Sequence, residues 1–171
     1  MKPEEKARVK IDQMFEDAGW KVVDRDFYSP TITAAAIREG LLEGNHEADY
    51  FLFINGKAVG VLEAKREEVN VASDIVCEQT IKYTRYVPEC YQAYLRPLPF
   101  IYQSNGVTTL FRDCRVEDSD YEPMNRIHTP KETNDDDDMT LTELMQTIQQ
   151  KSDNISKAVA QLQDLLKGIE E

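Results

Sequence analysis

Residues Asp49 to Lys65 read DYFLFI, then NGK, then AVGVLEAK, and this stretch decides the fold. Two apolar runs rich in β-branched and aromatic residues flank Asn55-Gly56, a dipeptide favoured in tight turns, and this pattern predicts a β-hairpin with largely buried strands. Asp49 stands at the outer end of the first strand, and Glu63 and Lys65 stand at the outer end of the second. The hairpin therefore gathers three ionisable groups at one end of a sheet.

These charges suggest a metal site. Glu63 and Lys65 are two residues apart in a strand, so they project from the same face. Two neighbouring carboxylates raise each other's pKa unless a divalent cation lies between them. Such a cation polarises a phosphate and helps to generate hydroxide, while a nearby lysine stabilises the developing charge or orients the attacking water. The pattern thus points to metal-dependent phosphodiester cleavage, and a solvated strand end is the alternative that it leaves open.

The register of the hairpin decides whether the two acids can meet. A strict two-residue loop at Asn55-Gly56 would pair Asp49 with Leu62 and leave Asp49 on the opposite face from Glu63. One extra residue must be absorbed, either by a three-residue loop with Gly56 left-handed or by a β-bulge near the strand ends. We therefore predict an irregularity in this hairpin.

A helix is predicted from Asn70 to Val87. Ile75, Val76, Gln79, Tyr83 and Tyr86 recur on one face at helical spacing. Gln79 is an amide on an otherwise apolar or aromatic face, so it needs a hydrogen-bonding partner if it is buried. Gln79 and Tyr83 lie one turn apart and can reach the same neighbour.

Taken together, these motifs resemble the PD-(D/E)xK nucleases, and specifically the N-terminal nuclease domain of the R subunit of type I restriction enzymes. The resemblance covers residues 4–131 and includes Arg8-x-x-Ile11-Asp12, Ala18-Gly19-Trp20, Ala48-Asp49-Tyr50, Gly56 to Lys65, Gln79-x-x-x-Tyr83, Pro99 to Tyr102 and Asn105-Gly106. It implies an α/β fold in which a mixed central β-sheet is flanked by helices. The family's proline is replaced here by Ala48, and that proline carries no chemistry.

The resemblance also implies roles for individual residues. Asp49 and Glu63 would bind Mg²⁺, for which Mn²⁺ is a possible substitute, and the Ala64 carbonyl would complete the metal shell. Lys65 would assist the attacking water. Gln79 and Tyr83 would position DNA or the groups of the active site. A further acid on the first helix belongs to many such sites, and Glu4 matches it better than Glu5.

The negative net charge of the chain is unfavourable for an enzyme that binds DNA phosphates. The net charge is −12, and residues 132–171 contribute −7 of it with ten acids and three lysines. The remaining 22 acids and 17 basic residues still give −5. Phosphate binding depends on cations, so we infer that strong DNA binding is supplied by other restriction-modification subunits or a larger assembly.

The composition also bears on location. The chain contains no apolar run of about 18 residues and has no signal-like N-terminus, so we expect a soluble, cytoplasmic protein without membrane contacts. Cys77, Cys90 and Cys114 are widely spaced and odd in number, which is typical of reduced and mostly buried thiols. Together with His46 and His128 they show no zinc-ligand spacing.

The rest of the chain is less distinctive. Before the hairpin we expect a helix from Pro3 to Gly19, a strand at Lys21 to Asp24 and a possible short helix at Ile32 to Arg38. After the helix containing Gln79, the three prolines from Pro88 to Pro99 rule out a single helix. A second hairpin of Phe100 to Gln103 and Val107 to Arg112 follows, and residues 113–138 are expected to be a connector with little structure. A crossover through the helix containing Gln79 places Phe100 to Gln103 parallel to the strand carrying Glu63. His46, Arg66, Lys82 and Arg85 could meet phosphates, although a solvated loop histidine and ordinary surface charges explain them as well.

The C-terminal part forms a separate region. We predict a nuclease domain over residues 1–131, an acidic linker over 132–139 and a long helix over 140–171. Thr140-x-x-Glu143 is a capping box. Apolar residues recur every seven positions, which resembles an imperfect coiled-coil seam: Leu141, Ile148, Ile155, Leu162 and Ile169.

Two classes of function fit these features. The first is a Mg²⁺-dependent DNA endonuclease domain, without ATP use of its own because no phosphate-binding loop of the Gly-x-x-x-x-Gly-Lys-Ser/Thr type occurs. The second is a catalytically silent module that keeps the nuclease fold and serves subunit assembly or regulation through its C-terminal helix.

The heptad spacing predicts that this helix projects or pairs with another helix, and folding back on its own domain is the alternative that it leaves open. Removing residues 139–171 should therefore change the oligomeric state or abolish partner binding. Sedimentation velocity and pull-down experiments on the truncated and full chains test this expectation. Identical behaviour of the two chains would contradict it.

Overall fold

The computed structural model describes residues 3–133 and 141–167, and the chain divides into two compact units, Met1–Asn134 and Asp135–Glu171. The elements of the first unit are α1 (Pro3–Asp17), β1 (Lys21–Asp24), η1 (Arg25–Phe27), β2 (Ala34–Leu41), η2 (Glu43–Asn45), β3 (Glu47–Ile54), β4 (Lys57–Ala64), α2 (Asp74–Tyr83), β5 (Gln92–Ala93), β6 (Phe100–Ser104), β7 (Thr109–Asp113), β8 (Glu122–Met124) and α3 (Pro130–Thr133). The described part of the second unit is the long helix α4 (Leu141–Lys167).

The described strands form one mixed sheet of eight strands in the order β1-β2-β3-β4-β6-β7-β8, with β5 pairing with β4 off this path. β4 and β6 run parallel, and α2 and β5 lie between them in sequence, as expected. The second hairpin is formed by β6 and β7. The predicted α/β class with a central mixed sheet and flanking helices is thereby confirmed.

The central hairpin contains the predicted irregularity. Its loop has two residues, Asn55 and Gly56, both with positive φ (49° and 76°), which is the conformation of a type I′ turn. The register then shifts, because Phe53 pairs with Ala58 whereas Leu52 pairs with Gly60. Val59 is therefore the extra residue of a bulge, which lies within β4 rather than in the loop or near the strand ends.

The bulge determines which residues share a face. Beyond it, Tyr50 pairs with Leu62, and continuing this register by one residue sets Asp49 opposite Glu63. Directly opposed residues of antiparallel strands project from the same face. Without the bulge, Asp49 would oppose Leu62 and would point away from Glu63.

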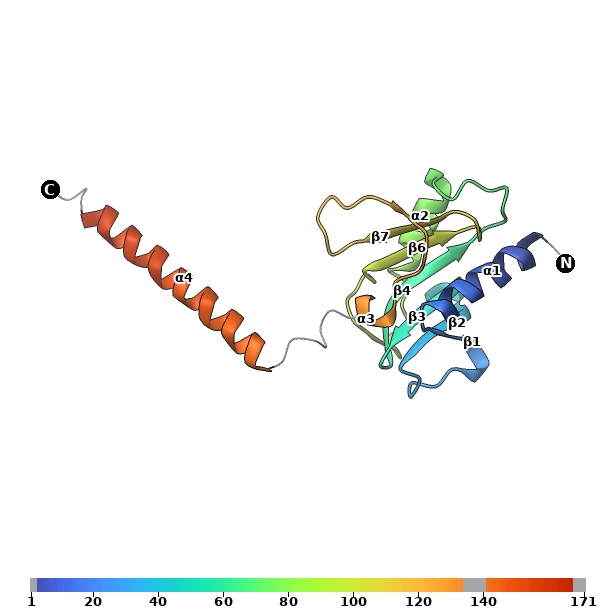
Figure 1. Cartoon of the computed structure of the whole chain (residues 1–171), viewed down its shortest axis with the longest axis horizontal. Coiled ribbons are helices and arrows are strands. Elements are labelled where there is room, and N and C mark those ends of the chain that lie inside the picture. The colour runs from blue at the N-terminus through green and yellow to red at the C-terminus, as the bar shows by residue number, and fades with distance from the viewer. Residues whose placement is uncertain (1–2, 134–140, 168–171) are drawn as a thin grey trace. The chain divides into compact units, whose positions relative to one another are not determined.

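Helices cover both faces of the sheet (Figure 1). One core contains Ile11 and Phe15 of α1 packed against Tyr50, Leu62 and further alternating strand residues. The other core lies on the face of α2 and contains the intervening strand residues, with the tyrosines of α2 and of the segment after it packed against them. Strands with both faces covered explain why β3 and β4 read as nearly continuous apolar runs.

Two expectations for local structure were wrong. Residues Ile32 to Arg38 are not a helix, because Ala34 to Leu41 form β2 between β1 and β3. Their alanines suit a helix by propensity, but pairing with two strands and burial outweigh propensity here. The helix predicted over residues 70–87 is shorter, and its buried residues are Val76 and Thr80, whereas Ile75 is exposed. Thr80 can be buried because its hydroxyl donates to the Val76 carbonyl at 2.7 Å.

The connector also differs from expectation. Up to residue 133 it is structured, since it contains β8 and α3 and buries Ile127 in the first core. The expectation of mostly buried thiols was wrong as well, because Cys90 and Cys114 are exposed and Cys77 is half-buried, although all three are free. Cys90 and Cys114 lie in turns outside the strands, where the core does not cover them. Residues 134–140, with the acidic run and Thr140, lie outside the described residues.

The predicted C-terminal helix is present as α4. Its exposed apolar residues include Ile155 and Leu162, two members of the heptad series. In the parts of the chain that the structure describes, no helix is both long enough and apolar enough to span a lipid bilayer.

His128 ties the connector to the core. Its Nδ1 lies 2.7 Å from the Tyr102 hydroxyl, and the indole nitrogen of Trp20 donates to its carbonyl oxygen at 2.8 Å. Burial lowers the pKa of His128 from its ordinary value of 6.5, because it disfavours the imidazolium. The unfolded chain therefore binds a proton at a higher pH than the folded chain does.

This difference predicts a pH-dependent contribution to stability. The contribution of His128 is complete above pH 6.5 and is lost as the pH falls through the lowered pKa of the folded state. As the pH falls from 8 to 5, the parent should lose a few degrees of melting temperature relative to His128→Asn, which keeps a polar group but cannot titrate. Differential scanning calorimetry of both proteins measures this, and parallel pH curves would contradict it.

Candidate functional site

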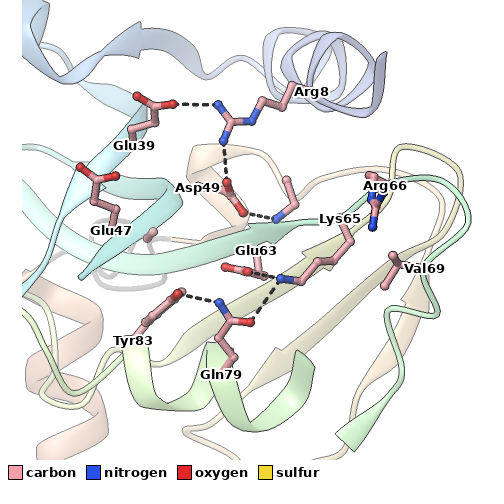
Figure 2. Close-up of a pocket in the computed structure, with 12 residues that line it drawn as sticks. Arg8, Glu39, Glu47, Asp49, Glu63, Lys65, Arg66, Val69, Gln79 and Tyr83 are labelled. Carbon is pink, nitrogen blue, oxygen red and sulfur yellow. Dashed lines mark hydrogen bonds and ion pairs between the residues drawn. The ribbon is translucent and has the colours of Figure 1, made fainter. Parts of the chain in front are cut away.

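A pocket of about 460 Å³ opens at the end of β4, next to α2 and the start of α1 (Figure 2). Strands β2, β3 and β4 supply its acids, α1 and the residues directly after β4 supply its basic groups, and α2 supplies an amide and a phenol. Its lining residues are Arg8, Glu39, Glu47, Ala48, Asp49, Glu63, Ala64, Lys65, Arg66, Val69, Gln79 and Tyr83. The predicted residues Asp49, Glu63, Ala64, Lys65, Gln79 and Tyr83 therefore lie around one cavity.

Both oxygens of Asp49 are engaged. Oδ1 accepts a hydrogen bond from the Arg8 guanidinium at 2.8 Å, and Oδ2 accepts one from the backbone N–H of Ala64 at 2.9 Å. Asp49 is thus held from two elements, α1 and β4, and these contacts orient its carboxylate at the pocket (Figure 2). Arg8 also donates to Glu39 at 3.0 Å, so one guanidinium bridges two carboxylates.

Glu63 is the most buried ionisable group of the pocket, with 3% of its surface exposed. Its Oε1 lies 2.5 Å from the Lys65 ammonium, whereas its Oε2 is buried and has no hydrogen-bond partner. Burial raises the pKa of Glu63, and repulsion from Asp49 raises it further, while the hydrogen bond from Lys65 opposes both effects. The strand register sets Asp49 opposite Glu63, so the two carboxylates share a face and repel each other.

A chain of hydrogen bonds continues from Lys65 to α2. The Lys65 ammonium also donates to the Gln79 side-chain oxygen at 3.2 Å, and the Gln79 nitrogen donates to the Tyr83 hydroxyl at 2.7 Å. Burial raises the pKa of Tyr83, so its hydroxyl stays protonated at neutral pH. The amide that seemed out of place on the helix thus has partners at both ends, and it links the lysine to the helix.

The main chain positions these groups. The Lys65 N–H donates to the Ser104 carbonyl at 2.8 Å, which extends the pairing of β4 with β6 by one residue. Lys65 therefore continues the alternation of the strand and faces the same way as Glu63. The Glu4 side chain lies outside the described residues, so its predicted role as a metal ligand stays a prediction.

Arg8 is one of the pocket residues that sequence reasoning left without a role, together with Glu39, Glu47 and Val69. It lies far from Asp49 in the sequence, and the pairing depends on how α1 crosses the sheet. One signal was available, because Arg8 directly follows Ala7 at the start of the buried helical stripe that continues with Ile11 and Phe15. A cation beside such a stripe usually has a carboxylate partner.

The other basic and aromatic candidates have different positions. Arg66 lines the pocket, as considered from the sequence. Lys82 lines a neighbouring groove instead, and Arg85 is exposed. His46 is exposed, as expected for a loop histidine, but its ring stacks on Tyr86 and does not line the pocket.

The donor set of the pocket fits a hard divalent cation. Asp49 and Glu63 supply carboxylate oxygens, and the unpartnered Oε2 of Glu63 is the kind of buried atom that a cation would satisfy. Within residues 3–133 and 141–167, no cluster of three or more acidic, histidine or cysteine side chains suited to a metal occurs. A metal bound here would therefore use two carboxylates, as Mg²⁺ often does together with waters and substrate phosphates.

The chain is similar to parts of type I restriction enzymes. The family described as the second domain of the endonuclease subunit of the type I restriction enzyme EcoKI matches residues 29–136. A solved fragment described as an HsdR subunit of a type I restriction enzyme from Vibrio vulnificus YJ016 shares the fold, with a TM-score of 0.51 and 19% sequence identity. The match covers 79% of this chain and 25% of that chain, so this chain spans about a quarter of it. No curated protein sequence matches the chain.

The buried charge of Glu63 should lower the free energy of unfolding, although the proposed chemistry needs that carboxylate. Its raised pKa means that the stabilising contribution of the protonated acid is present below the ordinary value of 4.5 and is lost as the pH rises through the raised pKa. Glu63→Gln keeps an oxygen for Lys65 and removes the buried charge. At pH 8 without metal, this variant should be more stable than the parent, by about 1–3 kcal/mol.

Urea unfolding at pH 8 and pH 4 measures this difference in the free energy of unfolding. The advantage of Glu63→Gln should shrink at pH 4, where the parent acid is protonated. Glu68→Gln is the matched control, because Glu68 is an exposed acid in the loop after β4, and it should change stability by less than about 0.5 kcal/mol. A Glu63→Gln variant less stable than the parent at pH 8 would contradict the prediction.

Proposed function

Because this chain belongs to the family defined by the second domain of the EcoKI endonuclease subunit, we propose that it is a Mg²⁺-dependent endonuclease domain that hydrolyses DNA phosphodiester bonds. The family membership confirms the resemblance to type I restriction enzymes that the motifs indicated. One observation carries the proposal: the groups expected to cut DNA line a single pocket, and its buried acid, Glu63, has an oxygen without a partner.

The carboxylates and one main-chain group form the proposed metal site. Asp49 and Glu63 would hold Mg²⁺ or Mn²⁺ together with the Ala64 carbonyl, and Glu4 is a further candidate ligand. A bound cation would polarise the scissile phosphate and lower the pKa of a water molecule. Its positive charge would also offset the repulsion between Asp49 and Glu63 and the burial of Glu63.

The remaining groups act on position and charge. Lys65 is held between Glu63 and Gln79, so its ammonium is fixed beside the acids, where it can orient the attacking water or neutralise charge that develops on the phosphate. Gln79 is fixed in turn by Tyr83. Arg8 orients the Asp49 carboxylate and adds positive charge to a pocket that carries four acids, Glu39, Glu47, Asp49 and Glu63.

Binding to DNA would need help from elsewhere. The residues before 132 carry a net charge of −5, and phosphate contacts depend on cations. We propose that other restriction-modification subunits, or further parts of the R subunit, hold the duplex and present it to this pocket. ATP-driven translocation would lie outside this chain, since its sequence contains no phosphate-binding loop.

A nuclease assay with Mg²⁺ on plasmid DNA tests the proposal. Lys65→Ala should lower the rate of cleavage by about 10²–10⁴-fold, because the group beside the attacking water is lost. Asp49→Ala should abolish cleavage through loss of a metal ligand. Lys57→Ala is the matched control, because Lys57 is an exposed lysine at the other end of the same strand, and it should cut like the parent.

Metal binding gives a second readout that does not depend on activity. Mn²⁺ should raise the melting temperature of the parent and of Lys57→Ala but should leave Asp49→Ala unchanged, since a ligand stabilises only the fold that binds it. The proposal is contradicted if the parent does not cut DNA and its melting temperature does not change in millimolar Mn²⁺. Equal cleavage by the parent and Lys65→Ala would remove the lysine from the mechanism.

A further inference from the structure

A second groove adjoins the pocket on the side of α2. Its volume is about 520 Å³, and Gln79 and Tyr83 line both the groove and the pocket. The rest of its lining includes the rings of His46 and Tyr86, the exposed side chain of Ile75 and the Lys82 ammonium. The groove is therefore continuous with the proposed active site, and it is flanked by aromatic rings, one cation and one acid, Glu78.

Two of these rings are already stacked. The centroids of His46 and Tyr86 are 4.9 Å apart and their planes differ by 15°. The backbone holds both residues in place, because the Leu42 N–H donates to the His46 carbonyl at 2.8 Å and the Glu43 N–H donates to the Tyr86 carbonyl at 2.7 Å. The loop around η2 is thus fixed against the end of the α2 segment, and the rings meet without a further rearrangement.

The position of Tyr83 connects the stack to the chemistry. Its ring centroid lies 6.4 Å from that of His46, and its hydroxyl accepts the hydrogen bond from Gln79, which in turn holds Lys65. The aromatic series therefore starts one side chain away from the proposed catalytic lysine. Tyr83 borders both the pocket and the groove, so a DNA strand can pass from one cavity into the other along this series.

We propose that the His46–Tyr86 stack is a platform for an unpaired nucleobase, so that this site takes the nucleotide next to the scissile phosphate unpaired, out of the duplex that the other subunits present. This inference rests on the proposed nuclease function and names the form of its substrate. A base inside a duplex has both faces covered by its neighbours, whereas an unstacked base offers a free face to an aromatic ring.

The charge of the domain favours this kind of contact. A surface with a net negative charge gains little from phosphates, and stacking is a source of binding free energy that does not depend on net charge. Lys82 lines the groove beside the acid Glu78, while Lys65, Arg8 and Arg66 line the pocket, where Lys65 and Arg8 are ion-paired with Glu63 and Asp49. The binding of single strands should therefore depend only weakly on salt, with the slope of about one or two phosphate contacts.

Binding measured without metal tests the platform separately from cleavage. Fluorescence anisotropy of a labelled thymine oligonucleotide in EDTA reports the dissociation constant for the full chain. His46→Ala and Tyr86→Leu should each raise it by about 10-fold, within the range expected for the loss of one stacking contact. Phe27→Ala is the matched control, because Phe27 is an aromatic residue that is 76% exposed and lies away from the groove, and it should bind like the parent.

An abasic oligonucleotide of equal length separates base stacking from phosphate attraction. The parent should bind it about as weakly as His46→Ala binds the thymine oligonucleotide. Equal affinity of the parent for the abasic and thymine strands, tighter binding of a duplex than of the single strand, or no measurable binding of single strands would each overturn the platform. Melting temperatures check that the variants fold. If Tyr86→Leu does not fold, His46→Ala still tests the platform, because His46 is exposed and its truncation should leave the fold intact.

A protein that binds single strands through these rings but never cuts DNA would leave the platform standing and refute the nuclease function. If His46→Ala cuts and binds DNA like the parent, the platform is refuted and the nuclease function stands. The two proposals therefore fail on different measurements.

Discussion

The single extra residue in β4 is the constraint on which the site depends. Side chains alternate along a strand with a period of two, so a shift by one residue reverses the face of everything beyond it. Val59 is absorbed in the bulge, and Asp49 therefore shares a face with Glu63 instead of pointing away from it. The same face is covered by α2, which brings Gln79 and Tyr83 to the acids.

The arrangement is electrostatically costly without a ligand. Glu63 is buried with one oxygen unpartnered, and it is close to a second carboxylate. The protein offsets part of this cost with Lys65 against Glu63 and Arg8 against Asp49. Such strain persists in folded proteins mainly where function requires it, and perturbed carboxyl groups in a cavity are typical of active sites. A bound cation would offset this cost, which supports the metal site that we propose.

Helix α2 couples the two cavities on its side of the sheet. Gln79 and Tyr83 hold the lysine in one cavity and form the wall of the other. A strand lying in both would be positioned by its phosphate and its base at once, which is how a weakly charged surface can still orient DNA. The chain belongs to the family defined by the second domain of the EcoKI endonuclease subunit, and a contact to DNA at these cavities accords with the function that we propose for it.

The local pattern of the sequence determined the hairpin, the parallel return of β6, the long C-terminal helix and the residues that meet in the pocket. These features rest on alternation, turn chemistry and motif spacing, which neighbouring residues set among themselves. The sequence also required one extra residue in the hairpin, because the acids could not otherwise meet, but it left open a three-residue loop or a bulge near the strand ends and did not place a bulge at Val59.

Only the tertiary structure decided the features that depend on distant partners. Ala34 to Leu41 form a strand because β1 and β3 lie on both sides of them, despite alanines that favour a helix. Arg8 reaches Asp49 because of where α1 crosses the sheet, and His46 stacks on Tyr86 because two backbone hydrogen bonds join their segments. Contacts between residues so far apart in the chain arise from packing, which one-dimensional periodicity does not encode.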